Sequence, residues 1–265
     1  MNQENTPTCE STRELANIPT CESTRELVNI PICEKDTDDN YRDLNRDILQ
    51  LPVISMYYPK VYDIALKHGF HNHHTSLEHD AVMIITELCE AINAHRARET
   101  FPQNLEDAIH MAIEDKKIEP DTSLNSFYYD LEKRRASVIG AYEEYINGTF
   151  PDELADAYIR CMNYIAYHQL NNMLKGKLEF TYGPEVRMKF ENNLRGLSLP
   201  HMIGVILEYF YNINQNQFYQ ESKCVMKLLI GIWAIANIFE IHLQGFIEAK
   251  ILYNANRPML HGKQY

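Results

Sequence analysis

The chain has 265 residues and a net charge of −12, with 45% hydrophobic and 23% charged residues. This composition is ordinary for a globular protein, and the length suffices for one large domain or two small ones. Because proteins bind duplex DNA through Lys and Arg, so negative a charge argues against nonspecific DNA binding. Gly (10) and Pro (11) are scarce, which favours helices over sheet.

The N-terminal 46 residues contain a repeat of period 12. TPTCESTRELAN is followed by IPTCESTRELVN and by a degraded copy, IPICEKD. Two and a half short, polar copies cannot bury a hydrophobic core. Residues 1–46 are therefore predicted to form a disordered tail. The repeat also explains the even spacing of Cys9, Cys21 and Cys33, which lack the spacing typical of metal ligands.

Several features bear on the location of the protein. The N-terminus has no basic region followed by an apolar core, and no run of about 18 apolar residues predicts a membrane span. The six cysteines form no CxxC motif, and Cys89 and Cys161 fall within predicted helices as small buried side chains. We therefore expect a cytoplasmic protein in a reducing setting, without a membrane partner.

Residues 47–265 are expected to form one helical domain. Its helices are predicted at 58–70, 76–99, 150–174, about 200–213 and 221–256, the last ending before Pro258. Ser76 is suited to cap the second of these helices, and Pro151 to lie in the first turn of the third. The polar stretch 100–149 is predicted to be an insertion with a helical part at 127–146. No convincing alternating strand occurs, so the predicted fold is an all-α bundle.

Two acidic pairs with the same spacing stand out. Glu87 and Glu90 lie three residues apart in IITELCEAINAHRA, and Glu153 and Asp156 do so in FPDELADAYIR. Both pairs lie on predicted helices among apolar residues, where carboxylates repel each other and lose hydration. One such pair usually marks a solvated helix face. Two pairs in apolar settings favour a cage for a divalent cation, since hard cations bind carboxylate oxygens.

These motifs resemble a known family. ELCE (87–90) followed by ELAD (153–156) is similar to the ExxE…ExxD signature of the MazG-like, all-α nucleoside triphosphate pyrophosphohydrolases. The ending KILYNANRPMLHGKQY also resembles the C-terminal block of phage and bacterial members. Together these blocks cover about a third of the chain. The gap between the acidic motifs is longer than in compact members, and Asn163 replaces a further acid found in many members.

The resemblance implies hydrolysis of a nucleoside or deoxynucleoside triphosphate to a monophosphate and pyrophosphate. It implies Mg²⁺, or Mn²⁺, held by the four acidic residues, with Glu87 and Glu90 as the catalytic candidates and Glu90 preferred as the base. It also implies a homodimer or higher oligomer, and a role in nucleotide-pool control or house-cleaning.

The substrate contacts are expected from two regions. Lys250, Asn254 and Arg257 recur at i, i+4 and i+7 near the C-terminus and would face the phosphates. His79 falls where the family often has a polar residue near the base or sugar. A solvated last helical turn is the alternative for the first group, since cations suit a helix C-terminus.

Two other functions remain open. The doublet His79-Asp80 suggests an HD-type metal phosphohydrolase, although His68, His71, His73 and His74 crowd too near it. The chain could instead be a noncatalytic helical interaction module. A module of that kind has no physical need for four clustered acids.

Overall fold

The protein is described by a computed structural model, which covers residues 54–71, 76–97, 100–118, 135–168, 184–211 and 218–258. Within these ranges the regular structure is entirely helical, so the predicted all-α fold is confirmed. Predictions for residues 1–46, for His73 and His74, and for residues 119–134 lie outside the described residues. The helices are α2 (Ile54–Lys67), α3 (Leu77–Ala97), α4 (Leu105–Glu114), α5 (Arg135–Ala141), the π-helical turn η2 (Tyr142–Ile146), α6 (Phe150–Tyr167), α8 (Pro184–Leu194), α9 (Leu199–Tyr211), α10 (Phe218–Ile238) and α11 (Leu243–Asn254).

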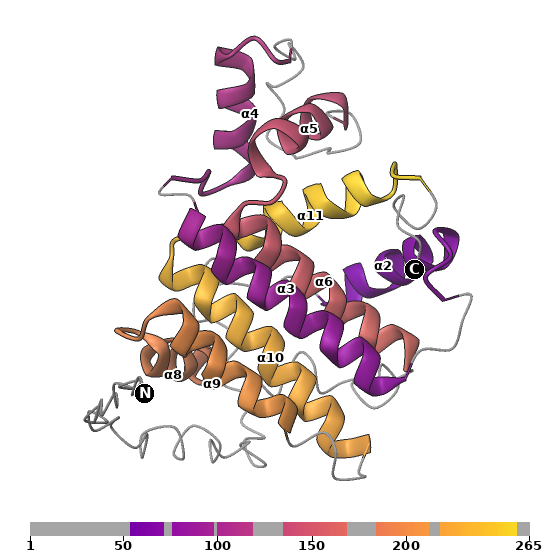
Figure 1. The fold of residues 1–265 in the computed structure, drawn as a ribbon, viewed down its shortest axis with the longest axis vertical. Coiled ribbons are helices and arrows are strands. Elements are labelled where there is room, and N and C mark those ends of the chain that lie inside the picture. The colour runs from indigo at the N-terminus through magenta and orange to yellow at the C-terminus, as the bar shows by residue number, and fades with distance from the viewer. Residues whose placement is uncertain are drawn as a thin grey trace, which may run out of the picture. The chain divides into compact units, whose positions relative to one another are not determined.

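Helix α6 is the centre of the fold. It packs against α2, α3, α10 and α11, and its most extensive contact is with α3, which runs beside it (Figure 1). Pro151 lies in its first turn as predicted, and Thr149 precedes that turn. Most side chains of α6 are buried, among them Leu154, Ala155 and Tyr158, and the rest are half-buried. Polar residues on this helix therefore need partners inside the protein.

Helix α3 has a buried face and a solvent face. Ser76 caps its N-terminus as predicted, because the backbone N–H of His79 donates to Ser76 Oγ at 3.2 Å. Ile84 and Leu88 of the predicted apolar stripe are buried. Cys89 is exposed, so its predicted burial is wrong. It lies on the solvent stripe with Thr86, whereas Cys161 on the central helix is buried as expected.

The predicted long helix at 221–256 is wrong, because the chain bends by 114° between α10 and α11. The N–H of Glu240 donates to Asn237 O and that of Ile241 to Ala236 O, the two bonds of a Schellman motif. Glu240 takes the left-handed conformation, with φ 59°. The same motif ends α2 at Gly69, where φ is 82°. A glycine at this position would have indicated a helix end, because glycine adopts a positive φ without strain. Glutamate carries no such signal, so the bend was not predicted.

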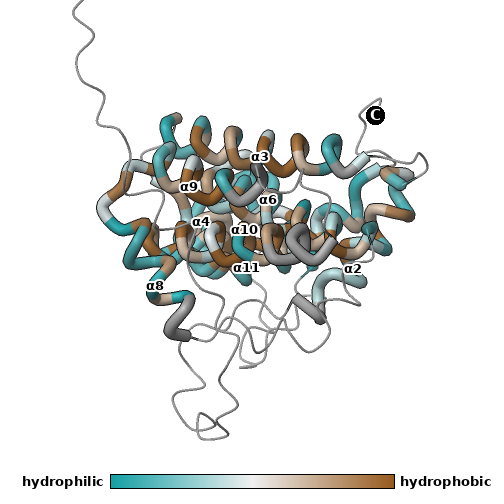
Figure 2. The backbone as a smooth tube through the Cα atoms, turned by 90° about the horizontal axis from the view of Figure 1, so that it is seen from below, coloured by the Kyte–Doolittle hydropathy of each residue, from teal (hydrophilic) through white to brown (hydrophobic). Residues whose placement is uncertain are grey.

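The remaining helices surround this core. α4 and α5 pack on each other beyond one end of α3 and α6, and α8 and α9 pack on α10 (Figure 1). α8 is largely hydrophilic and α10 mostly hydrophobic (Figure 2). Neither α4 nor α8 was predicted as a separate helix.

No single helix in the described part of the chain is long and apolar enough to cross a membrane. The bent pair Cys224–Ile238 and Leu243–Asn254 would pass such a test only when its two halves are taken together.

Candidate functional site

A cavity of about 260 Å³ lies among α2, α3, α6 and α11. It brings together residues up to 196 positions apart in the sequence, from Val61 on α2 to Arg257 after the end of α11. Seven of the eight residues predicted to form the site line it: Glu87, Glu90, Glu153, Asp156, Lys250, Asn254 and Arg257.

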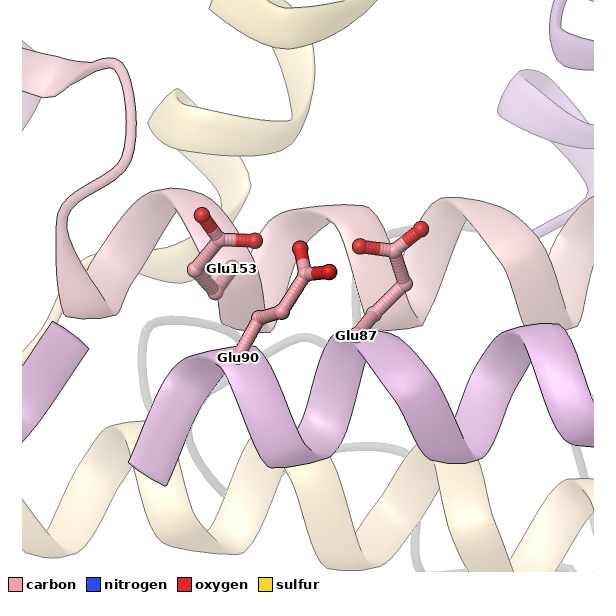
Figure 3. A group of neighbouring side chains, drawn as sticks. All are labelled: Glu87, Glu90 and Glu153. Carbon is pink, nitrogen blue, oxygen red and sulfur yellow. The ribbon is translucent and has the colours of Figure 1, made fainter. Parts of the chain in front are cut away.

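Three glutamates form a cluster in this cavity, which we call the glutamate triangle: Glu87, Glu90 and Glu153. One carboxylate oxygen from each lies within 4.8 Å of the others. Glu87 and Glu90 project from α3 toward α6, which carries Glu153 (Figure 3). Carboxylate oxygens at such separations suit a hard divalent cation such as Mg²⁺. Glu87 is 6% exposed and Glu90 is exposed, so the cluster extends from the interior of the protein to its surface.

The electrostatics of the triangle match its crowding. Burial raises the pKa of Glu87 from 4.5 to about 7, and Asp156 and Glu90 add to the rise while Arg160 opposes it. Burial likewise raises the pKa of Glu153 to about 8, reinforced by Asp152 and Asp156. The ionised triangle is therefore unfavourable without a compensating positive charge.

Arg160 supplies part of that charge. Its Nε donates to Glu87 Oε1 at 3.0 Å, across from α6 to α3. Arg160 also lies four residues after Asp156 on α6, the spacing of an i, i+4 ion pair. In the structure Arg160 forms its ion pair with Glu87, so it links the two acidic helices.

Lys250 forms ion pairs with the other two acidic residues of the cavity, Asp152 and Asp156. Its Nζ lies 3.0 Å from Asp152 Oδ1 and 2.7 Å from Asp156 Oδ2. The Lys250 side chain is only 5% exposed. Burial alone would lower the pKa of Lys250, but the two carboxylates outweigh it and raise the pKa above its usual value. Asp156 thus lies in the cavity, where it forms an ion pair with Lys250.

Asp152 is the principal residue that the sequence analysis missed. It is 1% exposed, accepts from the Gly148 N–H at 2.9 Å, and accepts a hydrogen bond from the Tyr142 hydroxyl. In the sequence it reads as an ordinary acid in the first turn of a helix. Tyr142 and Asn147 were also missed, although Asn147 lines the cavity. Both lie in the predicted insertion 100–149, which therefore contributes to the site.

The C-terminal block faces the same cavity. Lys250 and Asn254 lie one turn apart on α11, while Arg257 follows the end of that helix. The Asn254 side chain is 9% exposed, and its buried Oδ1 accepts no hydrogen bond. Arg257 lies over the ring of Tyr253, 5.5 Å from its centre, and Tyr253 stacks on Tyr142 at 4.3 Å. Tyr253 is thus engaged in an internal stack.

One wall of the cavity is apolar. Val61, Ile64 and Ala65 come from α2, Phe70 from the turn after it, and Ile159 from α6. This wall lacks charge, unlike the side formed by α3, α6 and α11. A ligand with a charged part and an apolar part could contact both.

The predicted substrate contact His79 lies apart from the triangle. His79 is exposed and is absent from the residues that line the cavity. At 1.5 Å per residue it lies roughly 12 Å along α3 from Glu87. The Oδ2 atom of Asp80 lies 2.8 Å from His168 Nε2. In the described part of the chain no cluster suited to a metal contains a histidine, so nothing there favours the HD-type hypothesis.

The His71 side chain packs between two tyrosine rings. Its ring stacks on Tyr62 at 5.1 Å and on Tyr167 at 4.3 Å, and its Nε2 lies 3.1 Å from Asn163 Oδ1. Burial lowers the pKa of His71. The ring therefore acts as part of an aromatic stack that fixes Asn163 at the edge of the cavity.

No protein family, curated protein or solved structure matches this chain.

Proposed function

We propose that the chain hydrolyses nucleoside or deoxynucleoside triphosphates to a monophosphate and pyrophosphate, with Mg²⁺ or Mn²⁺. The observation that carries this proposal is the glutamate triangle of α3 and α6 in one cavity with the polar residues of the C-terminal block. The resemblance to MazG-like enzymes rests on these same residues. Membership of that family, oligomerisation and a role in the nucleotide pool are parts of the same proposal.

The charge of the cavity supports a divalent cation. Five carboxylates and three cationic side chains line it, so two negative charges are in excess when all are ionised. A divalent cation held by Glu87, Glu90 and Glu153 would balance this excess. When bound, it would supply charge neutralisation for the phosphates and would lower the pKa of an attacking water.

The protein's own side chains would then position and deprotonate the water. Glu90 is the most exposed of the three glutamates, and we assign it as the acceptor of the water's proton. Glu87 is held in place by the 3.0 Å bond from Arg160. The water oxygen adds to phosphorus, the bond between the α and β phosphates breaks, and the proton passes to Glu90.

The phosphates need donors that the acidic side of the cavity lacks. Arg257 offers a guanidinium fork suited to phosphate oxygens, and Asn254 offers an amide N–H₂. The apolar wall formed by α2, Phe70 and Ile159 would accommodate the organic part of the nucleotide.

A product assay tests this function. Purified protein is incubated with a panel of NTPs and dNTPs, with Mg²⁺ or with EDTA, and pyrophosphate is measured separately from orthophosphate. Metal-dependent pyrophosphate and monophosphate are expected. Orthophosphate in place of pyrophosphate would contradict cleavage between the α and β phosphates. A Glu143→Gln variant, changed at an exposed residue of η2, should behave as the wild type.

An interaction module predicts a different outcome. Such a protein should release no product from any nucleotide, and Mg²⁺ should leave its melting temperature unchanged. The pairing of charges inside the cavity favours the enzyme, because a surface for partner binding needs no buried acidic cluster.

A further inference from the structure

The five carboxylates of the cavity divide into two groups that differ in how they are balanced. Asp152 and Asp156 share one ammonium, since Lys250 Nζ is 3.0 and 3.1 Å from the two oxygens of Asp152 and 2.7 Å from Asp156 Oδ2. Lys250 thus bridges two acids that lie four residues apart on α6. A bridging cation is the role that a metal ion commonly has between two carboxylates.

The surroundings of Lys250 hold it in this position. Its Nζ lies over the buried Tyr142 ring, 5.4 Å from the ring centre. The Tyr142 hydroxyl and the Gly148 N–H both donate to Asp152, so Asp152 accepts hydrogen bonds from three separate groups. If Lys250 left to contact a phosphate, Asp152 would remain buried with its charge uncompensated, which is strongly unfavourable.

The glutamate triangle lacks such a bridging ammonium. Among the described residues, its ion pair is the one between Arg160 and Glu87. An independent feature points to a missing ligand in the same cavity. Asn254, 9% exposed and part of the cavity lining, keeps a buried Oδ1 without a hydrogen-bond partner. The cavity therefore has one cation position already filled by the protein and one that needs a cation from outside.

We propose that Lys250 is a permanent counter-ion of Asp152 and Asp156, which takes the place of a second metal ion, so that each chain binds one divalent cation at the glutamate triangle. This inference rests on the proposed function, which supplies the need for a divalent cation. Lys250 is then a positioning residue rather than a phosphate ligand. It ties α11 to α6 and so sets Asn254 and Arg257 beside the cavity.

The test is a titration of the full-length, nucleotide-free protein with Mn²⁺, in which calorimetry gives the number of ions bound. The wild type should bind one Mn²⁺ per chain, and two would overturn the proposal. Lys250→Met removes the ammonium and leaves both aspartates, so it should bind two. Lys250→Met combined with Asp152→Asn removes a ligand of the new position and should return to one. A Lys250→Met protein that folds and still binds one ion would overturn the proposal.

Kinetics separate the failure of this inference from failure of the proposed function. A wild type that binds no Mn²⁺ and forms no pyrophosphate would remove both. A wild type that binds one ion and forms pyrophosphate retains the function, whatever Lys250 does. If Lys250→Met does not fold, Lys250→Arg decides, because it keeps the charge. Lys250→Arg should bind one Mn²⁺ and lower kcat more than it raises KM. A tenfold rise in KM with unchanged kcat would assign Lys250 to phosphate and overturn the inference.

Discussion

The two helices that carry the acids, α3 and α6, differ in how far they are enclosed. α6 is covered by α2, α3, α10 and α11, and its Asp152 is 1% exposed. α3 keeps a solvent face, and its Glu90 is exposed. The enclosed aspartate receives three hydrogen-bond donors from the protein, whereas the glutamate triangle has one ion pair among the described residues, that of Glu87 with Arg160. Contact with Lys250, and not depth alone, thus separates the carboxylates that the protein balances itself from those left for a ligand, since the Asp156 side chain is 23% exposed and that of Glu87 only 8%.

The largest effect is expected on turnover. Glu87→Gln removes a proposed cation ligand and should lower kcat/KM by more than about a hundredfold, since even the partners of metal ligands are worth about 10- to 100-fold. The fold should persist, because Gln removes a charge that burial disfavours. The measurement is pyrophosphate release with Mg²⁺, with circular dichroism as the check on folding. Activity within tenfold of the Glu143→Gln control would contradict the assignment.

A large effect on stability is expected on α6. Asp152→Ala leaves Lys250 buried with one carboxylate fewer, and such a change costs about 3–5 kcal/mol. Urea unfolding measures it. The matched control is Asp63→Ala on the exposed face of α2, where a change within about 0.5 kcal/mol is expected. Equal stabilities for the two variants would mean that the Lys250 network contributes little.

A smaller effect concerns pH. The raised pKa of Glu87, about 7 against 4.5, means that the folded chain holds this proton more tightly than the unfolded chain. The stability that this proton confers is complete below pH 4.5 and is lost as pH rises through about 7. In EDTA, the free energy of unfolding of Glu87→Gln, taken relative to that of the wild type, should therefore rise by on the order of 2 kcal/mol between pH 5 and pH 8. Saturating Mg²⁺ should abolish that gain. Parallel pH profiles of the two proteins in EDTA would refute it.

The smallest effect is expected from the N-terminal repeat. Deleting residues 2–46 should leave kcat and KM within about twofold, since a tail of short polar repeats is expected to be disordered and to take no part in catalysis. Steady-state kinetics on both chains measure this. A loss of tenfold or more would assign the repeat a part in substrate binding or assembly.

The acidic pairs and the C-terminal block could be recognised in the sequence because each is a local pattern on one helix. Glu87 and Glu90 are three residues apart, and so are Glu153 and Asp156. The cavity does bring them together with Lys250, Asn254 and Arg257. How they pair could not be predicted, since the contact between Lys250 and Asp152 joins residues 98 positions apart. No spacing rule encodes such a contact.

The fold shows the same division. The all-α class follows from composition and periodicity, which are properties of the chain alone. The bend after α10 depends on Glu240 adopting φ 59°, and no glycine or proline marks that position. His79 was assigned to the site by its place in a motif, yet it lies on the exposed first turns of α3 and is not among the residues that line the cavity.

The most direct test is a crystal structure of the full chain grown with Mn²⁺, with the ions located by their anomalous scattering. The account predicts one peak per chain within bonding distance of Glu87, Glu90 and Glu153, with Lys250 still between Asp152 and Asp156. A peak between the two aspartates, or no peak at the glutamate triangle at saturating Mn²⁺, would contradict it.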